Sequence, residues 1–266
     1  MNNASANQKE YLKKRLHHKR MVTIMRILIL VLFIALWEIT ARLGIIDSFI
    51  FSSPSRVLNT FISMVQDKTI FLHVGVTLAE TLISFALVVL LGIATAVLLW
   101  LSKKLSEILE PYLVVLNSLP KSALAPLLIV WLGANMKTII VAGISVAIFG
   151  TILNLYTGFK EVSPDKIKLI YTLQGTKKDV LLRVVLPSTI PTIISVMKVN
   201  IGLALVGVVI GEFIGSKQGL GYLIIYGSQV FKLDWVIMSI VILCIIAMGL
   251  YTIIHFVVKS SLKNFY

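Results

Sequence analysis

The chain has 266 residues, of which 58% are hydrophobic and only 14% charged, and its mean hydropathy is +0.94. Soluble domains carry about 45–50% apolar and about 25% charged residues, so this composition excludes an ordinary water-soluble fold. The net charge of +13 does not indicate a nucleic-acid-binding protein, because the basic residues lie in the gaps between apolar runs, as in membrane proteins. The single cysteine, Cys244, permits no intrachain disulfide.

Residues 1–25 are polar and basic, which predicts a cytoplasmic tail that is disordered or lies on the membrane. His17 and His18 have no cysteine or carboxylate cluster beside them, so no metal site is expected there. The next run is a poor match to a cleaved signal peptide, since Glu38 and Arg42 follow it in place of a small-residue cleavage site.

Six apolar stretches are each long enough to cross a membrane, which takes about 20 helical residues. The predicted spans are Ile27–Ile46, Thr81–Ser102, Pro111–Met136, Thr138–Phe159, Ser188–Gly211 and Trp235–Val258. Only Lys137 separates the third span from the fourth, which predicts a tight hairpin with Gly133, Ala134 and Asn135 in its turn. The runs lack the alternation of a membrane barrel. We therefore expect an all-α, polytopic transmembrane helical bundle over residues 26–262, followed by a cytoplasmic tail over 263–266.

The distribution of basic residues predicts the orientation of the bundle. Seventeen lie in the N-terminal tail, the loops after the second and fourth spans and the C-terminal tail, against six on the opposite side. Basic residues are retained in the cytoplasm, so both termini are expected there, in a multi-pass protein of the bacterial plasma membrane.

The longest cytoplasmic connection, residues 160–187, predicts two short helices around a break. Pro164 can open the first helix with Ser163 as its N-cap. Gln174, Gly175 and Thr176 form the break, because glycine accepts backbone angles that stop a helix, and which of the three makes the turn stays open. Val180, Leu181, Val184 and Val185 then form an apolar stripe, before Leu186 and Pro187 end the segment. An amphipathic helix of this kind either rests on lipid or docks in a partner's groove, and its pattern alone favours neither.

Several motifs carry a resemblance to a known family. Tyr171–Thr176, followed by Val184–Pro187, resembles the "EAA" loop of ABC importer permeases, although Lys168, Leu169 and Ile170 replace the usual Glu-Ala-Ala and Gln174 stands where the family glycine falls. The other matching stretches are Ser52–Ser55, Asn117–Pro120, Ala125–Leu127, Trp131–Gly133, Glu212 and Gly219–Leu223. Their order over more than 200 residues is similar to the nitrate, sulfonate and taurine branch of that family.

The resemblance implies a set of partners and no enzymatic activity in this chain. Family members form the pathway as two permease subunits, with two cytoplasmic ATPase subunits on their loops and an extracytoplasmic binding protein that delivers the solute. ATP and magnesium would bind to the ATPase, and the chain itself has no G-x-x-x-x-G-K-[ST] phosphate loop. The implied solute is small and anionic or heterocyclic. The residues implied in ATPase coupling are Leu173, Gln174, Gly175, Thr176, Lys177, Lys178, Leu186 and Pro187.

Polar residues within the predicted spans are candidates for the pathway, because charges are costly in lipid. Lys121 and Lys198 are the deepest, with Asn117 and Asn200 close to them in sequence. Either lysine could instead extend to the membrane surface or cap a helix carbonyl. Glu38, Glu80 and Glu212 lie nearer the outer interface, where structural pairing is expected.

Two other functional classes compete with an importer subunit. A membrane-embedded enzyme would need a convergent nucleophile and base or a metal-ligand cluster, and His17, His18, His73 and His255 are too scattered to supply one. A secondary transporter would often have internal repeats, and no clear repeat is present. Copurification with a soluble ATPase would separate the three classes.

Overall fold

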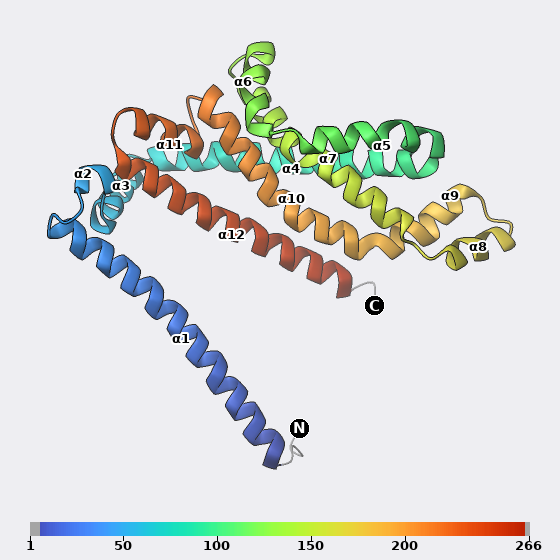
Figure 1. Ribbon diagram of the computed structural model, residues 1–266, viewed down its shortest axis with the longest axis horizontal. Helices are drawn as coiled ribbons and strands as arrows, with labels where there is room; N and C mark the ends of the chain where they lie inside the picture. Colours follow the sequence, from blue (N-terminus) through green and yellow to red (C-terminus); the bar gives the residue numbers. More distant parts are fainter. Residues whose placement is uncertain (1–5, 264–266) are drawn as a thin grey trace.

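The computed structural model describes residues 6–263, with side-chain surroundings for residues 13–256, so part of the expected tails at 1–5 and 264–266 lies outside the described residues. All regular structure in the described range is helical (Figure 1). The helices are α1 (Ala6–Arg42), α2 (Ser48–Phe51), α3 (Pro54–Gln66), α4 (Thr69–Leu101), α5 (Lys103–Ser118), α6 (Lys121–Leu132), α7 (Met136–Lys160), α8 (Pro164–Thr172), α9 (Lys177–Val180), α10 (Leu186–Gly215), α11 (Leu220–Gln229) and α12 (Leu233–Lys263).

Five of the six predicted spans match membrane-length helices, and the third differs. Within the described chain, α1, α4, α7, α10 and α12 are each long and apolar enough to cross a membrane, and α5 and α6 meet the same criteria only when taken together as a bent pair. The third span was predicted as one helix and is instead broken by a bend of 98°. Leu119 has an extended backbone at the break, because the residue before a proline avoids the helical region and Pro120 has no N–H to donate.

Three helices, α4, α7 and α10, form the centre of the bundle through close glycine contacts. A Cβ atom added to Gly207 of α10 would lie 2.8 Å from the Cα atom of Gly143 in α7, and one added to Gly143 would lie 2.6 Å from the hydroxyl oxygen of Ser84 in α4. Helices approach this closely in membranes where small residues face one another, since apolar lipid leaves packing as the main source of attraction. This core therefore depends on the absence of side chains at these crossings.

The short helices α2, α3 and α11 gather at one end of the bundle with the start of α12 (Figure 1). Glu212 of α10 holds this end together by accepting hydrogen bonds from the hydroxyl of Thr77 and the backbone N–H of Gly221, each at 2.6 Å. Glu80 is buried beside this network. The predicted structural role of Glu212 is confirmed.

The N-terminal helix α1 stands away from the bundle and contacts it mainly through α2 and α3 (Figure 1). Glu38 pairs with Arg42 at 2.6 Å and accepts the backbone N–H of Ser55 at 3.0 Å, which confirms its predicted structural pairing and ties α1 to α3. Of the two expectations for the basic tail, disorder is wrong for residues 6–25, because α1 is helical from Ala6 onward and continuous with the first span, and a position on the membrane surface stays a prediction.

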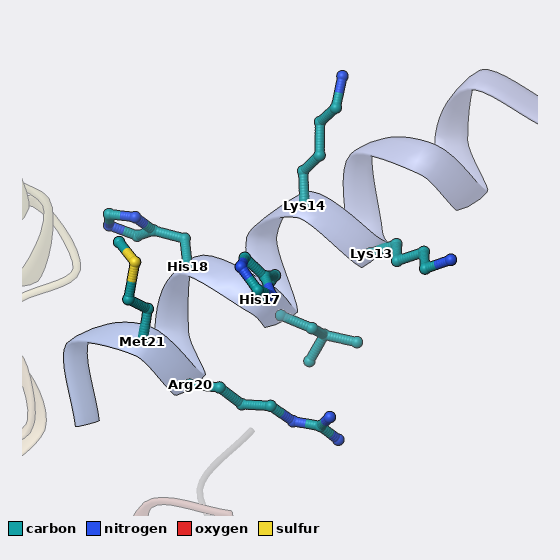
Figure 2. A pocket seen from close by; sticks show the side chains of 7 residues that line it. Lys13, Lys14, His17, His18, Arg20 and Met21 are labelled. Carbon is teal, nitrogen blue, oxygen red and sulfur yellow. The ribbon is translucent and has the colours of Figure 1, made fainter. Parts of the chain in front are cut away.

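A shallow hollow along the basic part of α1 does not form a site. Its side chains come from one helix and radiate from it, with Lys14 and Arg20 pointing to opposite sides (Figure 2). Within the described residues no group of three metal-ligating side chains occurs here or elsewhere. The basic segment therefore presents positive charge around the helix and no convergent binding geometry.

Candidate functional site

A polar groove runs along the outside of the bundle between α7 and α10. Its cavity has a volume of about 390 Å³. The hydrogen-bonding side chains in its lining are Asn154, Thr157 and Glu161 of α7 and Thr192, Ser195 and Asn200 of α10. Gly158 lets the two helices meet beneath the groove, since an added Cβ atom there would lie 2.9 Å from the Cγ2 atom of Thr192. The groove is thus a surface of uncharged polar groups that ends in one acid.

The groove begins near the middle of α7, a helix long and apolar enough to cross a membrane, and runs to its C-terminal end. Helix α7 has 25 residues and is therefore roughly 37 Å long, so Gly150 falls near its middle, Asn154 lies about 9 Å from the middle toward the C-terminal end, and Glu161 follows that end. Asn154, Thr157 and Ser195 are exposed in the single chain. Polar side chains at this depth are not expected to face lipid, because hydrocarbon offers no hydrogen-bond partners. This face must therefore meet water or another protein surface.

The structure brings two of the four sequence-predicted pathway residues to this groove. Asn117 lies at the end of α5 over Gly150, where an added Cβ atom would be 3.2 Å from its side-chain oxygen. Asn200 lines the groove but is buried, and its amide donates to the hydroxyl oxygen of Thr151 at 2.7 Å. Asn117 is thus exposed beside the groove, whereas Asn200 also joins α10 to α7.

The two lysines lie elsewhere. The Nζ atom of Lys121 donates to the backbone oxygens of Leu116, at 2.9 Å, and Asn117, so it caps the carbonyl groups left open where α5 ends at the bend. Lys198 is partly buried on α10 and is absent from the groove lining. It falls about 60° around the helix from Ser195 and about 100° from Val199, both of which do line the groove.

The second candidate region is the connection between α7 and α10, at the end of the bundle opposite α2, α3 and α11 (Figure 1). Helix α8 begins at Pro164 after Ser163, as predicted, and α9 begins with a capping box in which Thr176 and Asp179 bond each other's backbone N–H. The Nζ atom of Lys177 donates to the backbone oxygen of Leu101 at 2.8 Å and lies over the ring of Trp100. The turn is therefore anchored to the end of α4.

The turn between α8 and α9 is made by Gln174 and not by Gly175. Gln174 has φ +59°, in the left-handed region, so of the three residues at the predicted break, Gln174 makes the turn that the sequence left open. Gly175 is required for another reason: an added Cβ atom would clash with the side chain of Ile170 and lie 2.9 Å from its carbonyl oxygen. The family position of the turn is thus kept, and a glutamine occupies it.

The apolar stripe after this turn packs into the protein's own core. Val180, Leu181 and Val185 are buried against residues of α4, α5 and α7, including Leu99 and Phe159. Neither of the expected locations, a lipid surface or a partner's groove, applies to these three side chains. The apolar groups left exposed in this region are Leu169, Tyr171, Leu173 and Leu182.

Leu186 and Pro187 begin α10 and do not end the segment as predicted. A π-helical turn, Leu181–Val185, joins α9 to α10, and the N–H of Leu186 bonds to the carbonyl of Leu181. Pro187 has no N–H and would interrupt a regular helix, but the wider turn before it keeps the chain helical from Lys177 to Gly215. The segment from Lys177 to Val185 and the fifth span are therefore one continuous element.

Sequence reasoning missed the main polar lining of the groove. Asn154, Thr157 and Glu161 are spaced three and four residues apart, and so are Thr192, Ser195 and Val199, which places each set on one helix face. This periodicity was the available signal. This signal was weaker than that of the two lysines within the predicted spans, because uncharged polar residues are common in membrane helices.

Comparison with known proteins gives a consistent family. Residues 88–262 match the family model described as "Binding-protein-dependent transport system inner membrane component". A probable ABC transporter permease protein of Haemophilus influenzae is 31% identical over 225 residues, which cover 85% of this chain and 91% of the relative. The formylaminopyrimidine transport permease protein of Halalkalibacterium halodurans is 29% identical over 195 residues, which cover 73% of this chain and 77% of the relative. Permeases named for sulfonates, taurine and nitrate are also among the relatives.

The fold agrees with this assignment. A chain of the MetNI methionine ABC transporter, in an inward-facing conformation, superposes with a TM-score of 0.61 over 71% of this chain and 94% of that chain, at 18% identity. The family model covers more than half of the sequence, and the helices with a broken third span suit a membrane subunit. The chain therefore belongs to the binding-protein-dependent transport system inner membrane component family, the permease subunits of ABC importers.

Proposed function

We propose that the groove between α7 and α10 is one half of the solute pathway, which a second copy of the chain completes. One observation supports this proposal most directly. Asn154, Thr157 and Ser195 line a cavity of about 390 Å³ and are exposed on helices that are long enough to cross a membrane. A two-fold dimer would face the groove with its own symmetry mate and remove these groups from lipid. In contrast, the exposed side chains of α1 and the middle of α12 are mostly apolar and suit contact with lipid.

The same proposal assigns energy coupling to the turn between α8 and α9. Leu169, Leu173 and the turn at Gln174 project at the end of the bundle where α7 and α10 are joined. A separate ATPase subunit, with its own ATP and magnesium, would dock there, and a second would dock on the other permease copy. Because α9 continues into α10, a push on the turn would be transmitted directly along the helix that lines the groove.

The orientation belongs to the proposal as well. The basic residues favour a cytoplasmic location for the coupling turn and both termini. The opposite end, with α2, α3 and α11, would then face the binding protein. A secondary transporter, the competing class, would need neither the ATPase nor the binding protein.

A blocking substitution tests the pathway. Ser195→Trp places a large ring in the groove, and Met248→Trp places the same ring on α12 at a side chain that is 63% exposed and away from it. Both variants are assembled with ATPase and binding protein in liposomes, and solute uptake is measured. Ser195→Trp is expected to stop uptake while Met248→Trp transports normally. Normal uptake by Ser195→Trp would show that solute does not pass through this groove.

Two further measurements test the assembly. Differently tagged copies of the chain should copurify with each other and with the ATPase. A chain that transports solute without any ATPase would instead be a secondary transporter.

A further inference from the structure

The groove carries a distinctive charge pattern. Among the residues that line it there is no lysine or arginine, and its one charged side chain is Glu161 at the inner end. Lys121 is occupied in capping α5, and Lys198, although only three residues after Ser195, is not among the residues that line the groove. A symmetric second copy would add the same residues and therefore no cation. The complete pathway at this depth would be uncharged, with two acids near its inner mouth.

The uncharged side chains in the lining are free to bind a passing solute. Within the described chain, the side chains of Asn154, Thr157, Thr192 and Ser195 form no hydrogen bond with another protein group. An amide and three hydroxyls both donate and accept hydrogen bonds. They alternate with apolar surface from Val196, Val199 and Leu203, which can contact the face of a ring.

From this pattern we infer that the transported solute is a small uncharged molecule with several hydrogen-bonding groups, of the heterocyclic class, and not an oxyanion. The inference rests on the proposed pathway and specifies what passes along it. An oxyanion such as a sulfonate or nitrate would exchange part of its hydration shell for uncharged groups without meeting a cation, and it would approach Glu161, which repels it. An uncharged aminopyrimidine-like ring has no charge to desolvate and is not repelled by Glu161. Its polar edge can form hydrogen bonds with the amide and hydroxyl groups of the lining, while its faces contact Val196 and Val199.

The electrostatic preference of the groove can be measured without knowing the solute. In a Cys244→Ser background, which has no other cysteine, Ser195→Cys places a thiol in the groove and Ser228→Cys places one on exposed α11 as a control. The nucleotide-free transporter, with its ATPase, is treated with three methanethiosulfonates of similar size: sulfonatoethyl, hydroxyethyl and trimethylammonioethyl. Each rate is divided by the rate of the same reagent with free mercaptoethanol.

At Ser195→Cys the sulfonate reagent is expected to react at least tenfold more slowly than the hydroxyethyl reagent, whereas at Ser228→Cys the two should react within threefold of each other. Adding Glu161→Gln is expected to raise the sulfonate rate and lower the trimethylammonium rate in the groove. A sulfonate rate equal to or above the hydroxyethyl rate at Ser195→Cys would overturn the inference. Failure of all three reagents at Ser195→Cys would instead overturn the proposed aqueous pathway itself.

Uptake provides the second readout. Liposomes containing the whole transporter, with its binding protein, are given equal concentrations of a formylaminopyrimidine or of ethanesulfonate, an anion without an ammonium group, as probes. Uptake of the pyrimidine is expected to exceed that of ethanesulfonate by at least tenfold. Equal uptake, or uptake in the reverse order, would contradict the assignment to an uncharged heterocycle even if the groove variants behave as described.

Discussion

The backbone N–H of Gly221 donates to the Oε2 atom of Glu212 at 2.6 Å, and this bond closes the start of α11 against the end of α10. The Oε1 atom of the same carboxylate accepts the hydroxyl of Thr77, also at 2.6 Å, so α4 joins the contact. Glycine is needed at Gly219 and Gly221, since an added Cβ atom at either position would clash with the Glu212 side chain. One buried acceptor thus organises three helices at the proposed outer end.

Glu212→Gln is expected to lower the free energy of unfolding by about 1–3 kcal/mol, because its amide offers one acceptor oxygen where two buried donors must be satisfied. Thermal unfolding of the detergent-solubilised protein measures the change. Glu107→Gln, at a side chain that is 66% exposed, is the matched control and should be neutral. An unchanged melting temperature for Glu212→Gln would mean that the two donors find other partners.

Two adjacent substitutions separate conformation from crowding in the coupling turn. Gln174→Gly is expected to stabilise the protein by about 1 kcal/mol, because it relieves a non-glycine residue at φ +59°. Gly175→Val should destabilise it, since its side chain would meet Ile170. Thermal unfolding of both variants is the measurement. Stabilisation by Gly175→Val, or a large loss from Gln174→Gly, would contradict the observed turn.

Leu173→Asp tests the exposed docking surface. Leu173 is 71% exposed, so the variant should fold and insert normally, yet bind the ATPase about tenfold or more weakly if one leucine contact worth about 1.5–3 kcal/mol is lost. Copurification and solute-stimulated ATP hydrolysis measure the loss. Leu173→Met keeps an apolar contact and serves as the control. Val180→Asp, at a fully buried position, should instead prevent folding. Wild-type coupling in Leu173→Asp would remove this surface from the interface.

The lysines provide a test that distinguishes capping from solute contact. Lys121→Met should reduce stability by leaving the carbonyls of Leu116 and Asn117 without a donor, at about 1–3 kcal/mol. Lys198→Met should retain uptake, because Lys198 lies outside the groove lining. Thermal unfolding and uptake are measured for both. A large loss of uptake in a stable Lys198→Met protein would return this lysine to the pathway, as the sequence alone suggested.

Cysteine labelling in intact cells tests the orientation. In a Cys244→Ser background, a membrane-impermeant reagent should reach Ser216→Cys, between α10 and α11, and miss Ser163→Cys, just before α8. The reason is the excess of basic residues on the side that carries Ser163. Labelling of both positions after the cells are opened shows that each thiol is reactive. The reverse pattern would invert the topology.

The sequence by itself determined the properties that depend on local composition. A helix crosses a membrane if it is long and apolar enough, and each residue contributes nearly independently, so six spans and the turn at Gly133–Asn135 could be predicted. The pairing of Glu38 with Arg42 was also accessible, because the two residues are one helical turn apart. The ordered family motifs supplied the functional class.

Only the tertiary structure decided which face of each helix stays exposed once the helices pack against one another. The glycine crossings of α4, α7 and α10 rotate these helices so that Asn154 and Ser195 face outward, while Lys198 turns aside and Asn200 bonds Thr151. The same packing buries Val180, Leu181 and Val185, which the sequence alone placed against lipid or a partner, and a π turn carries the chain through Pro187. These outcomes depend on contacts between residues far apart in sequence. Helical periodicity gives a residue's direction relative to its own axis but not which neighbour, lipid or solute that direction meets.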